Sequence, residues 1–115
     1  MFTLSYCAAG CGRPAVFGSS LCAAHLVDPA EEARRIGEFI KQKKVIKDLN
    51  AQGLNFEGMD FTGRYFYGCS FSEASFIHCD FTAVYMRLVF FDFSKFVSCD
   101  FPRGDFRYIS FAGQI

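Results

Sequence analysis

Four potential metal ligands lie close together near the start of this chain. Cys7, Cys11, Cys22 and His25 follow the spacing C-x3-C-x10-C-x2-H, in which two close pairs are separated by a short loop. A tetrahedral Zn²⁺ is bound by thiolate sulfur and imidazole nitrogen, and a close pair supplies two such ligands from a single turn. The pattern therefore predicts a metal site that suits Zn²⁺.

The segment resembles a short zinc finger with three Cys and one His ligand, of the treble-clef or knuckle type. We predict a module over residues 1–27 with a structural ion, because four protein ligands leave no position for a catalytic water. Reduced thiols, or disulfides in an oxidising compartment, are the alternatives, but neither explains a His at ligand spacing. Arg13 is the only basic residue of the finger, so a phosphate-binding surface is not expected there.

A capping or linking helix is predicted over residues 28–51, where it would connect this module to the rest of the chain. Asp28 suits the N-cap, Pro29 suits the first helical position, and Glu31 completes a capping box. An apolar stripe should cover the open end of the domain that follows, and it consists of Ile36, Phe39, Ile40, Ile46 and Leu49.

The rest of the chain repeats with a period of five residues. Every fifth residue from 56 to 111 is Phe except Met86: Phe56, Phe61, Phe66, Phe71, Phe76, Phe81, Phe91, Phe96, Phe101, Phe106 and Phe111. Helical faces recur at about 3.6 residues and strand faces at about 2, so a strict period of five indicates a repeated backbone turn. Such internal repeats are typical of solenoids.

The positions around each central residue follow a second pattern. The residue two before it is mostly small or apolar, and the residue just before it is often Asn, Asp or Ser, which form turns. Glycine, which accepts the angles of a corner, follows some of these Phe residues by two positions: Gly58, Gly63, Gly68 and Gly113. On these twelve units, residues 52–115 resemble the pentapeptide-repeat family. Arg64, Met86 and Phe90 depart from its pattern, and we expect bulges or special surfaces there.

The resemblance implies a mainly β protein, a right-handed quadrilateral β-helix with twenty residues per coil and about three coils. Residues twenty apart should then stack, so that four ladders of side chains fill the interior. Three of the expected ladders are Phe56 on Phe76 on Phe96, Phe61 on Phe81 on Phe101, and Phe71 on Phe91 on Phe111; the fourth is Phe66 on Met86 on Phe106. The remaining cysteines, Cys69, Cys79 and Cys99, occupy small inward positions and are interpreted as core.

The sequence offers no catalytic constellation and no membrane span. It lacks a glycine-rich loop leading into a helix and a set of Ser, His and acid, and we do not expect an enzyme. No apolar run has the length of a membrane span, and the N-terminal sequence lacks the regions of a signal peptide, so a cytoplasmic protein without membrane contact is predicted.

Charge is balanced overall but unevenly distributed. Residues 1–47 hold seven basic and four acidic residues, whereas residues 48–115 hold five and eight. Four lysines lie late in the predicted helix, where they complement its dipole: Lys41, Lys43, Lys44 and Lys47. We interpret them as a solvated face, with a contact to an anionic partner as the alternative.

Function is therefore sought on the outer faces of the repeat. Stacking by twenty residues gathers aromatic, Arg and apolar side chains on one face and the next: Tyr65, Tyr67, Tyr85, Arg87, Leu88, Phe90, Phe93, Arg107 and Tyr108. Aromatic residues with Arg are typical of protein-binding hot spots, and a soluble monomer seldom exposes such a cluster. We expect a partner surface here, unless the helix or a terminal segment folds over it.

The last coil supplies a second expected interface. The sequence ends at Ile115, shortly after Phe111, so the final coil would expose unpaired backbone groups and the ends of the ladders. In the pentapeptide-repeat family this coil commonly mediates two-fold dimerisation, so the resemblance implies a homodimer. Docking of the coil onto a larger protein is the alternative.

Three hypotheses about function follow from these patterns. The first is a non-enzymatic, zinc-stapled scaffold that binds a protein partner through its aromatic face and C-terminal coil. The resemblance alone suggests the second, because some pentapeptide-repeat proteins mimic duplex DNA and bind type II topoisomerases such as gyrase. Three coils with a charge of about −3 argue against such mimicry, which needs a long negative rod, unless dimerisation doubles the length. The third is a nucleic-acid-binding regulator that uses the finger and the lysines.

Overall fold

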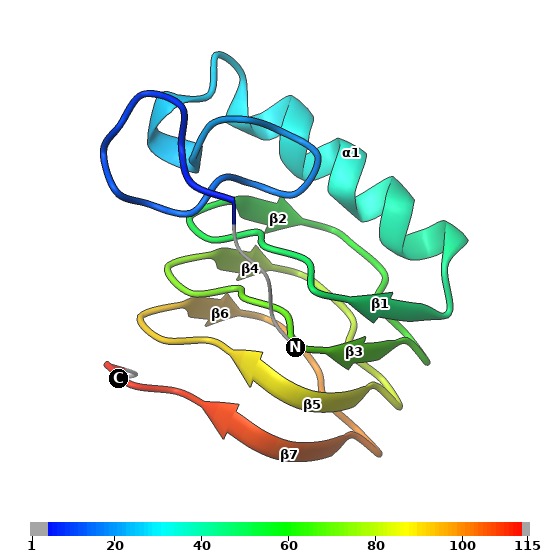
Figure 1. Ribbon diagram of the computed structural model, residues 1–115. Coiled ribbons are helices and arrows are strands. Elements are labelled where there is room, and N and C mark those ends of the chain that lie inside the picture. The colour runs from blue at the N-terminus through cyan, green and yellow to red at the C-terminus, as the bar shows by residue number, and fades with distance from the viewer. Residues whose placement is uncertain (1–4, 114–115) are drawn as a thin grey trace.

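The computed structural model describes residues 5–113, in which a short N-terminal module and one helix cover the top of a β-helix (Figure 1). The elements follow in the order η1 (Ala23–His25), α1 (Pro29–Gln42), β1 (Val45–Lys47), β2 (Asn55–Glu57), β3 (Tyr65–Tyr67), β4 (Ser75–Ile77), β5 (Tyr85–Phe90), β6 (Lys95–Val97) and β7 (Asp105–Ser110). The predicted mainly β solenoid of about three coils is confirmed.

Two parallel sheets form two sides of the solenoid, in the orders β1-β3-β5-β7 and β2-β4-β6. The register advances by twenty residues, so that Phe56 pairs with Phe76 and Phe76 with Phe96. Isolated bridges form the other two sides, with Asn50, Ser70 and Phe90 on one and Asp60, Asp80 and Asp100 on the other. Four sides per coil explain the period of five, because each unit supplies one side and one corner.

The interior consists of the predicted ladders. The ring of Phe76 stacks between those of Phe56 and Phe96, with centroids 5.4 and 5.1 Å away. Phe81 stacks in the same way between Phe61 and Phe101, at 5.0 and 4.8 Å. Each fully buried Phe stabilises the fold by about 1.5–3 kcal/mol, and stacked pairs add about 0.5–1.5 kcal/mol. The ladders therefore supply the energy that orders this short chain.

The helix begins where the sequence predicts, but it ends earlier. The backbone N–H of Glu31 donates to the Asp28 carboxylate at 3.2 Å, which is one half of the predicted capping box, while the Glu31 carboxylate pairs with Arg34. The helix stops at Gln42 instead of continuing through residues 28–51, and Ile46 lies in β1, paired with Phe66. Ile46 takes the ladder position above Phe66, because full burial there outweighs a place on a half-covered helix. The first coil accordingly begins before residue 52.

The helix caps the first coil as expected. Ile36 and Ile40 are fully buried and belong to the same apolar core as Phe56. Gly37 permits the close approach, since a Cβ at this position would lie 2.6 Å from the sulfur of Met59. Figure 1 shows α1 lying across the top of the coils, next to β2. The helix thus shields the upper ends of the ladders from water.

Candidate metal centre and candidate protein-binding surface

A small loop with antiparallel pairing positions the first two candidate ligands. Tyr6 forms a bridge with Pro14, and the Cys7 backbone N–H donates to the carbonyl of Arg13 at 2.9 Å. The turn that follows Cys7 is closed by the Gly10 N–H, which donates to the Cys7 carbonyl at 3.0 Å. Gly10 has a φ of 78°, which favours glycine over other residues. This turn brings Cys7 and Cys11 to one side of the loop.

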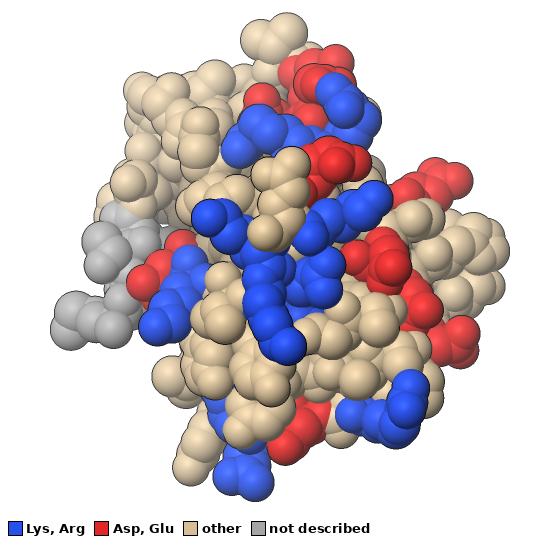
Figure 2. Space-filling view, turned by 90° about the vertical axis from the view of Figure 1, so that its right-hand side faces the viewer, with Lys and Arg blue, Asp and Glu red and all other residues tan. Residues whose placement is uncertain are grey.

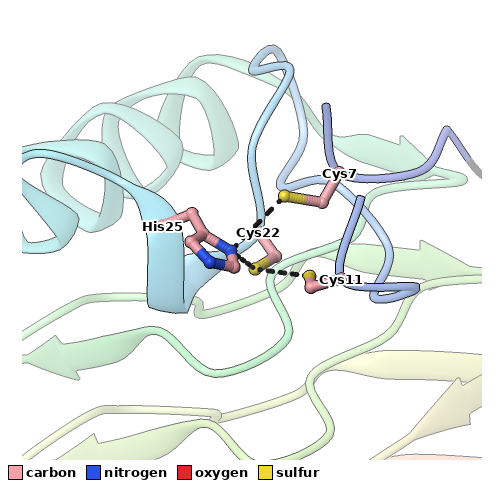
Figure 3. A group of neighbouring side chains, drawn as sticks. All are labelled: Cys7, Cys11, Cys22 and His25. Atoms are coloured by element: carbon pink, nitrogen blue, oxygen red, sulfur yellow. Dashed lines mark hydrogen bonds between the residues drawn. The ribbon is translucent and has the colours of Figure 1, made fainter. Parts of the chain in front are cut away.

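The second pair lies at the two ends of η1, with Cys22 as its N-cap and His25 as its last residue, and the four side chains converge (Figure 3). Their ligand atoms all lie within 4.8 Å of one another. The Cys7 sulfur lies 3.6 Å from Nδ1 of His25, and the Cys11 and Cys22 sulfurs are 3.6 Å apart. A tetrahedral Zn²⁺ with bonds of about 2.3 Å to sulfur and about 2.1 Å to nitrogen places its ligand atoms about 3.6–3.8 Å apart. The cluster therefore has dimensions that fit a tetrahedral metal ion.

The four side chains of the cluster shift one another's pKa values in different directions. Burial raises the pKa of the Cys22 thiol, but hydrogen bonds from His25 and the neighbouring thiols outweigh burial and lower this pKa to about 6. A backbone hydrogen bond from Cys22 lowers the pKa of Cys7. The Cys22 and Cys7 side chains in turn raise the pKa of His25. The thiolate and the neutral imidazole are the forms that bind metals, so the lowered pKa values of Cys22 and Cys7 favour coordination, whereas the raised pKa values of Cys11 and His25 mean that an ion would displace protons there.

The loop of the metal module is fixed to the helix and the first coil. The side-chain N–H of the buried Asn50 donates to the carbonyl of Ala15 at 2.7 Å. The backbone carbonyl of Asn50 accepts a hydrogen bond from the Phe17 N–H at 2.8 Å. The rings of Phe17 and Phe39 lie 4.8 Å apart, and the Arg35 guanidinium donates to the carbonyl of Phe17. The Cys/His cluster therefore lies in a module whose loop packs directly on the solenoid.

We call the outer surface of the sheet β1-β3-β5-β7 the tyrosine face; its outward residues are Val45, Lys47, Tyr65, Tyr67, Tyr85, Arg87, Asp105 and Arg107. The rings of Tyr65 and Tyr85 are stacked with centroids 4.9 Å apart. The Arg87 guanidinium lies 3.7 Å from the centre of the Tyr85 ring, and Nζ of Lys44 lies 5.9 Å from that of Tyr65. This column is held together by aromatic and cation–π contacts within the chain.

The residues predicted to bind a partner therefore differ in accessibility. Tyr65, Tyr67, Tyr85 and Arg87 are half-buried by their contacts with one another. The side chains that project furthest are exposed: Leu88 (56 %), Phe90 (37 %), Phe93 (65 %), Tyr108 (78 %) and Arg107. Rings that stack cover one another's faces, so those faces are not open to a partner. The sequence pattern does not show this stacking. The exposed apolar surface thus lies beside the column of tyrosines.

Three of these exposed residues, Leu88, Phe93 and Tyr108, occupy corners with left-handed backbone angles, as do six other non-glycine residues among those described. Leu88 and Tyr108 have φ values of 54° and 57°, in the left-handed region that favours glycine. Gly68 occupies the same corner one coil above Leu88, with a φ of 62°. A bulky side chain costs about 1–2 kcal/mol more than glycine at such an angle. The chain therefore carries exposed apolar side chains where glycine would be the more stable choice.

A groove of about 560 Å³ adjoins this corner. Among the described residues it is lined by Val45, Lys47, Asp48, Tyr67, Gly68, Leu88 and Phe90. Gly68 contributes no side chain between Asp48 above it and Leu88 below it, and this gap leaves the wall hollow. The sequence places these residues on one face but cannot show that glycine opens a groove there.

The last coil presents a free edge within residues 5–113. In the coil above, the Phe81 N–H donates to the carbonyl of Asp100 at 2.9 Å. Phe101 takes the same position one coil lower, where no described residue lies beneath it. Phe106 and Phe111 are 37 % and 46 % exposed at this end of the ladders. Ile115, the other residue predicted for this interface, lies outside the described residues.

A family model matches part of the repeat. Residues 65–103 match the family model of the pentapeptide repeats in eight copies. Proteins with pentapeptide repeats are generally non-enzymatic, and the match points to a fold of the protein-interaction or scaffold kind. The metal module lies outside the matched residues. No curated protein and no solved structure matched the chain.

Within residues 5–113, the one α-helix is too short and too polar to cross a membrane.

Proposed function

We propose that this chain is a non-enzymatic interaction module that binds a protein partner beside its tyrosine face. The observation that carries the proposal is the pair Leu88 and Tyr108, which project from left-handed corners beside an apolar groove. A solenoid that only needed to fold would gain stability from glycine at both corners. Other left-handed corners also carry residues other than glycine, but Leu88 and Tyr108 expose large side chains there, and such apolar and aromatic anchors dominate the binding energy of interfaces.

The bound metal in this proposal is a structural zinc ion. Three thiolates and one imidazole in a tetrahedral arrangement are typical of zinc, and four protein ligands close the site. Its role is to hold the loop around Val16 and Phe17 against α1 and Asn50. Because the metal site is absent from the unfolded chain, zinc binding adds to the free energy of folding.

The edge of the last coil is proposed as a second contact. Its partly exposed Phe106 and Phe111, and a strand edge that no residue of 5–113 pairs with, support end-to-end pairing with a second copy or docking onto a larger protein. A homodimer would extend the solenoid and bury both edges. The two arrangements differ in the mass of the purified species, which light scattering measures directly.

The experiment compares two double variants of the tagged full chain, expressed in its own host. Leu88→Gly with Tyr108→Gly removes the exposed side chains, and both substitutions relieve a left-handed backbone angle. His78→Gly with Ser98→Gly relieves the same angle at the stacked corners of the opposite sheet, where φ is 53° and 54°. The two variants are thus matched in backbone chemistry and differ in the face that they change. Mass spectrometry then identifies what copurifies in stoichiometric amount.

Loss of a stoichiometric partner from the Leu88 and Tyr108 variant alone is the expected result. Equal recovery of that partner with both variants would refute the proposed surface. A topoisomerase as the partner, with inhibition or protection in a supercoiling assay, would favour the DNA-mimic hypothesis instead. Recovery of the chain alone, as a dimer by light scattering, would assign the function to the homo-oligomer.

A further inference from the structure

Basic side chains gather where α1 ends and β1 begins. Lys41, Lys43 and Lys44 are exposed, and with Arg64 they form what we call the basic rim. A hollow of about 350 Å³ lies among them, lined by Lys41, Gln42, Lys43, Lys44, Gly63 and Arg64. Figure 2 shows Lys and Arg side chains gathered in the middle of this side of the molecule. The rim borders the tyrosine face through Lys44, which lies over Tyr65.

No acidic side chain of residues 5–113 forms an ion pair with the lysines of the rim. The ion pairs among residues 5–113 join Arg34 to Glu31, Arg35 to Glu32, and both Arg87 and Arg107 to Asp105. Asp60 interacts electrostatically with Arg64 and Lys41, and its carboxylate accepts a hydrogen bond from the Thr62 N–H. The positive charge of the rim is therefore available to a molecule outside the chain.

Two of these lysines are held in place by aromatic rings. Nζ of Lys43 lies 5.8 Å from the centre of the Phe39 ring, and Lys44 is placed over Tyr65 in the same manner. Arg64 donates to the carbonyls at the end of α1, which neutralises the negative end of the helix dipole next to the hollow. Pre-positioned cations lose less conformational entropy when they bind an anion, and such a site favours binding.

The stacking of Tyr65 and Tyr85 favours an acidic polypeptide over a nucleic acid as the anion that binds this surface. Proteins that bind single-stranded nucleic acid stack bases on free aromatic faces. Tyr65 is covered by Tyr85 on one face and approached by Lys44, and Tyr85 is covered by Tyr65 and Arg87. These two rings therefore offer edges and hydroxyl groups to an incoming molecule, and edges suit the side chains of a polypeptide.

We propose that the basic rim and the groove beside Leu88 together bind an acidic protein segment that carries apolar residues. The hollow lies at the start of β1 and the groove at its end, from Lys44 to Lys47. An extended chain covers this distance in about three to four residues, at about 3.3 Å per residue. Carboxylates of the segment pair with the lysines, and its apolar residues contact Val45 and Leu88. This inference rests on the proposed function and names the chemistry of the partner.

The test uses the purified, metal-loaded full chain and a fluorescent peptide of sequence EELEELEE, with binding followed by anisotropy. A peptide with Gln in place of every Glu, and a single-stranded oligothymidylate of about equal length, are measured beside it. The triple variant Lys43→Gln, Lys44→Gln and Lys47→Gln removes charge from the rim and β1. Its control removes the same charge from exposed residues elsewhere, by Arg13→Gln, Lys95→Gln and Arg103→Gln.

The acidic peptide should bind, and its affinity should fall as salt rises because the contacts are exposed. Binding should weaken by about tenfold or more in the rim variant and stay within about twofold of wild type in the control variant. No binding of the acidic peptide at low salt, equal weakening in both variants, or tighter binding of the oligonucleotide would overturn the inference. The proposed function is tested independently of this inference, because its experiment uses variants of Leu88 and Tyr108 and a native partner. If the rim variant still binds the native partner but Leu88→Gly with Tyr108→Gly does not, the proposed function is supported. The inference that the partner binds through an acidic segment is then wrong.

Discussion

The guanidinium of Arg64 donates a hydrogen bond of 2.9 Å from Nε to the carbonyl oxygen of Ile40, so a residue of the solenoid closes the end of α1. A second N–H, on Nη2, reaches the carbonyl of Lys41 at 2.9 Å. The last carbonyls of a helix lack partners within the helix, and a cation close to them also balances the dipole. Arg64 departs from the small residue usual at its position in the repeat because it performs this function.

Replacement of Arg64 should therefore destabilise the joint between helix and solenoid. We expect Arg64→Gln to lower the free energy of unfolding by about 1–3 kcal/mol, the range for hydrogen bonds that involve a charged group. Urea denaturation measures the loss, and Arg103→Gln, on an exposed corner, serves as the control. Hydrogen exchange should speed up at the Lys43 amide, which donates to Ile40 at the end of the helix. Equal stability of the two variants would mean that the cap contributes nothing.

The ladders should tolerate truncation unequally along their length. Phe76 is fully buried between two stacked rings, whereas Phe111 is 46 % exposed at the last coil. Phe76→Ala should lower the free energy of unfolding by about 3–5 kcal/mol, because it opens a cavity that the rigid coils cannot close. Phe111→Ala should cost less than about 2 kcal/mol, since it gives up roughly half of that burial. Chemical denaturation of both variants checks the difference, which would vanish if the last ring were as buried as the middle one.

The sequence predicts repeated elements well and single contacts poorly. The five-residue period specifies the coils and the stacking of Phe56 on Phe76, because each unit obeys the same geometry. The period is hard to recognise upstream, where Ile46 and Ala51 occupy ladder positions without Phe, and Ile46 equally fits a helical stripe. Metal ligands are recognisable because coordination demands fixed residue types at close spacing.

The contacts that join the module to the solenoid leave no such pattern. Asn50 occupies a position where Asn is common for turn formation, so nothing in the sequence distinguishes its second bond, to the carbonyl of Ala15. The filling of both faces of the Tyr85 ring likewise depends on side-chain orientation, which the register alone does not determine. Predictions of partner residues from the sequence therefore included rings that are already occupied within the chain.

Burial should make the Cys69 thiol inert. Desolvation raises the pKa of Cys69 to about 12, so almost no thiolate is present near neutral pH, and the thiolate is the reactive form. We expect iodoacetamide at about pH 8 to leave Cys69 unmodified in the folded chain and to modify it in urea, as read by peptide mass spectrometry. Cys99, which is partly exposed, is the internal comparison. Rapid labelling of Cys69 without denaturant would contradict this burial.

The same pKa has a consequence for stability at high pH. The unfolded thiol releases its proton near about pH 8.5, and the folded one only at higher pH. The contribution of Cys69 is therefore fully present below about pH 8.5 and is lost as the pH rises towards 12. Cys69→Ala should reduce this alkaline loss, which denaturation curves at several pH values measure.

Loss of the proposed metal site should loosen the module more than the solenoid. Cys22→Ser deletes a ligand whose sulfur lies 3.2 Å from Nδ1 of His25, and the variant should bind less than one zinc per chain by elemental analysis. The apparent stability of the module should fall by more than about 4 kcal/mol, as is typical when a structural metal is lost. Hydrogen exchange should then rise at the Phe17 amide and stay low at the core strand residue Phe76. Full zinc content in the variant would exclude Cys22 as a ligand.

The left-handed corners provide the final test, because they predict opposite effects on stability and on binding. Leu88→Gly relieves a backbone angle that costs about 1–2 kcal/mol, and the side chain removed is 56 % exposed, so little burial is lost. We expect the free energy of unfolding to stay the same or to rise by up to about 1 kcal/mol, as urea denaturation would show. Leu88→Ala is the control, since it removes the side chain but keeps the strained angle and should be less stable than Leu88→Gly. A variant that folds more stably and yet loses its partner would show that the chain gives up stability at this corner for recognition. A drop of more than about 1 kcal/mol would instead mean that Leu88 is held there by packing.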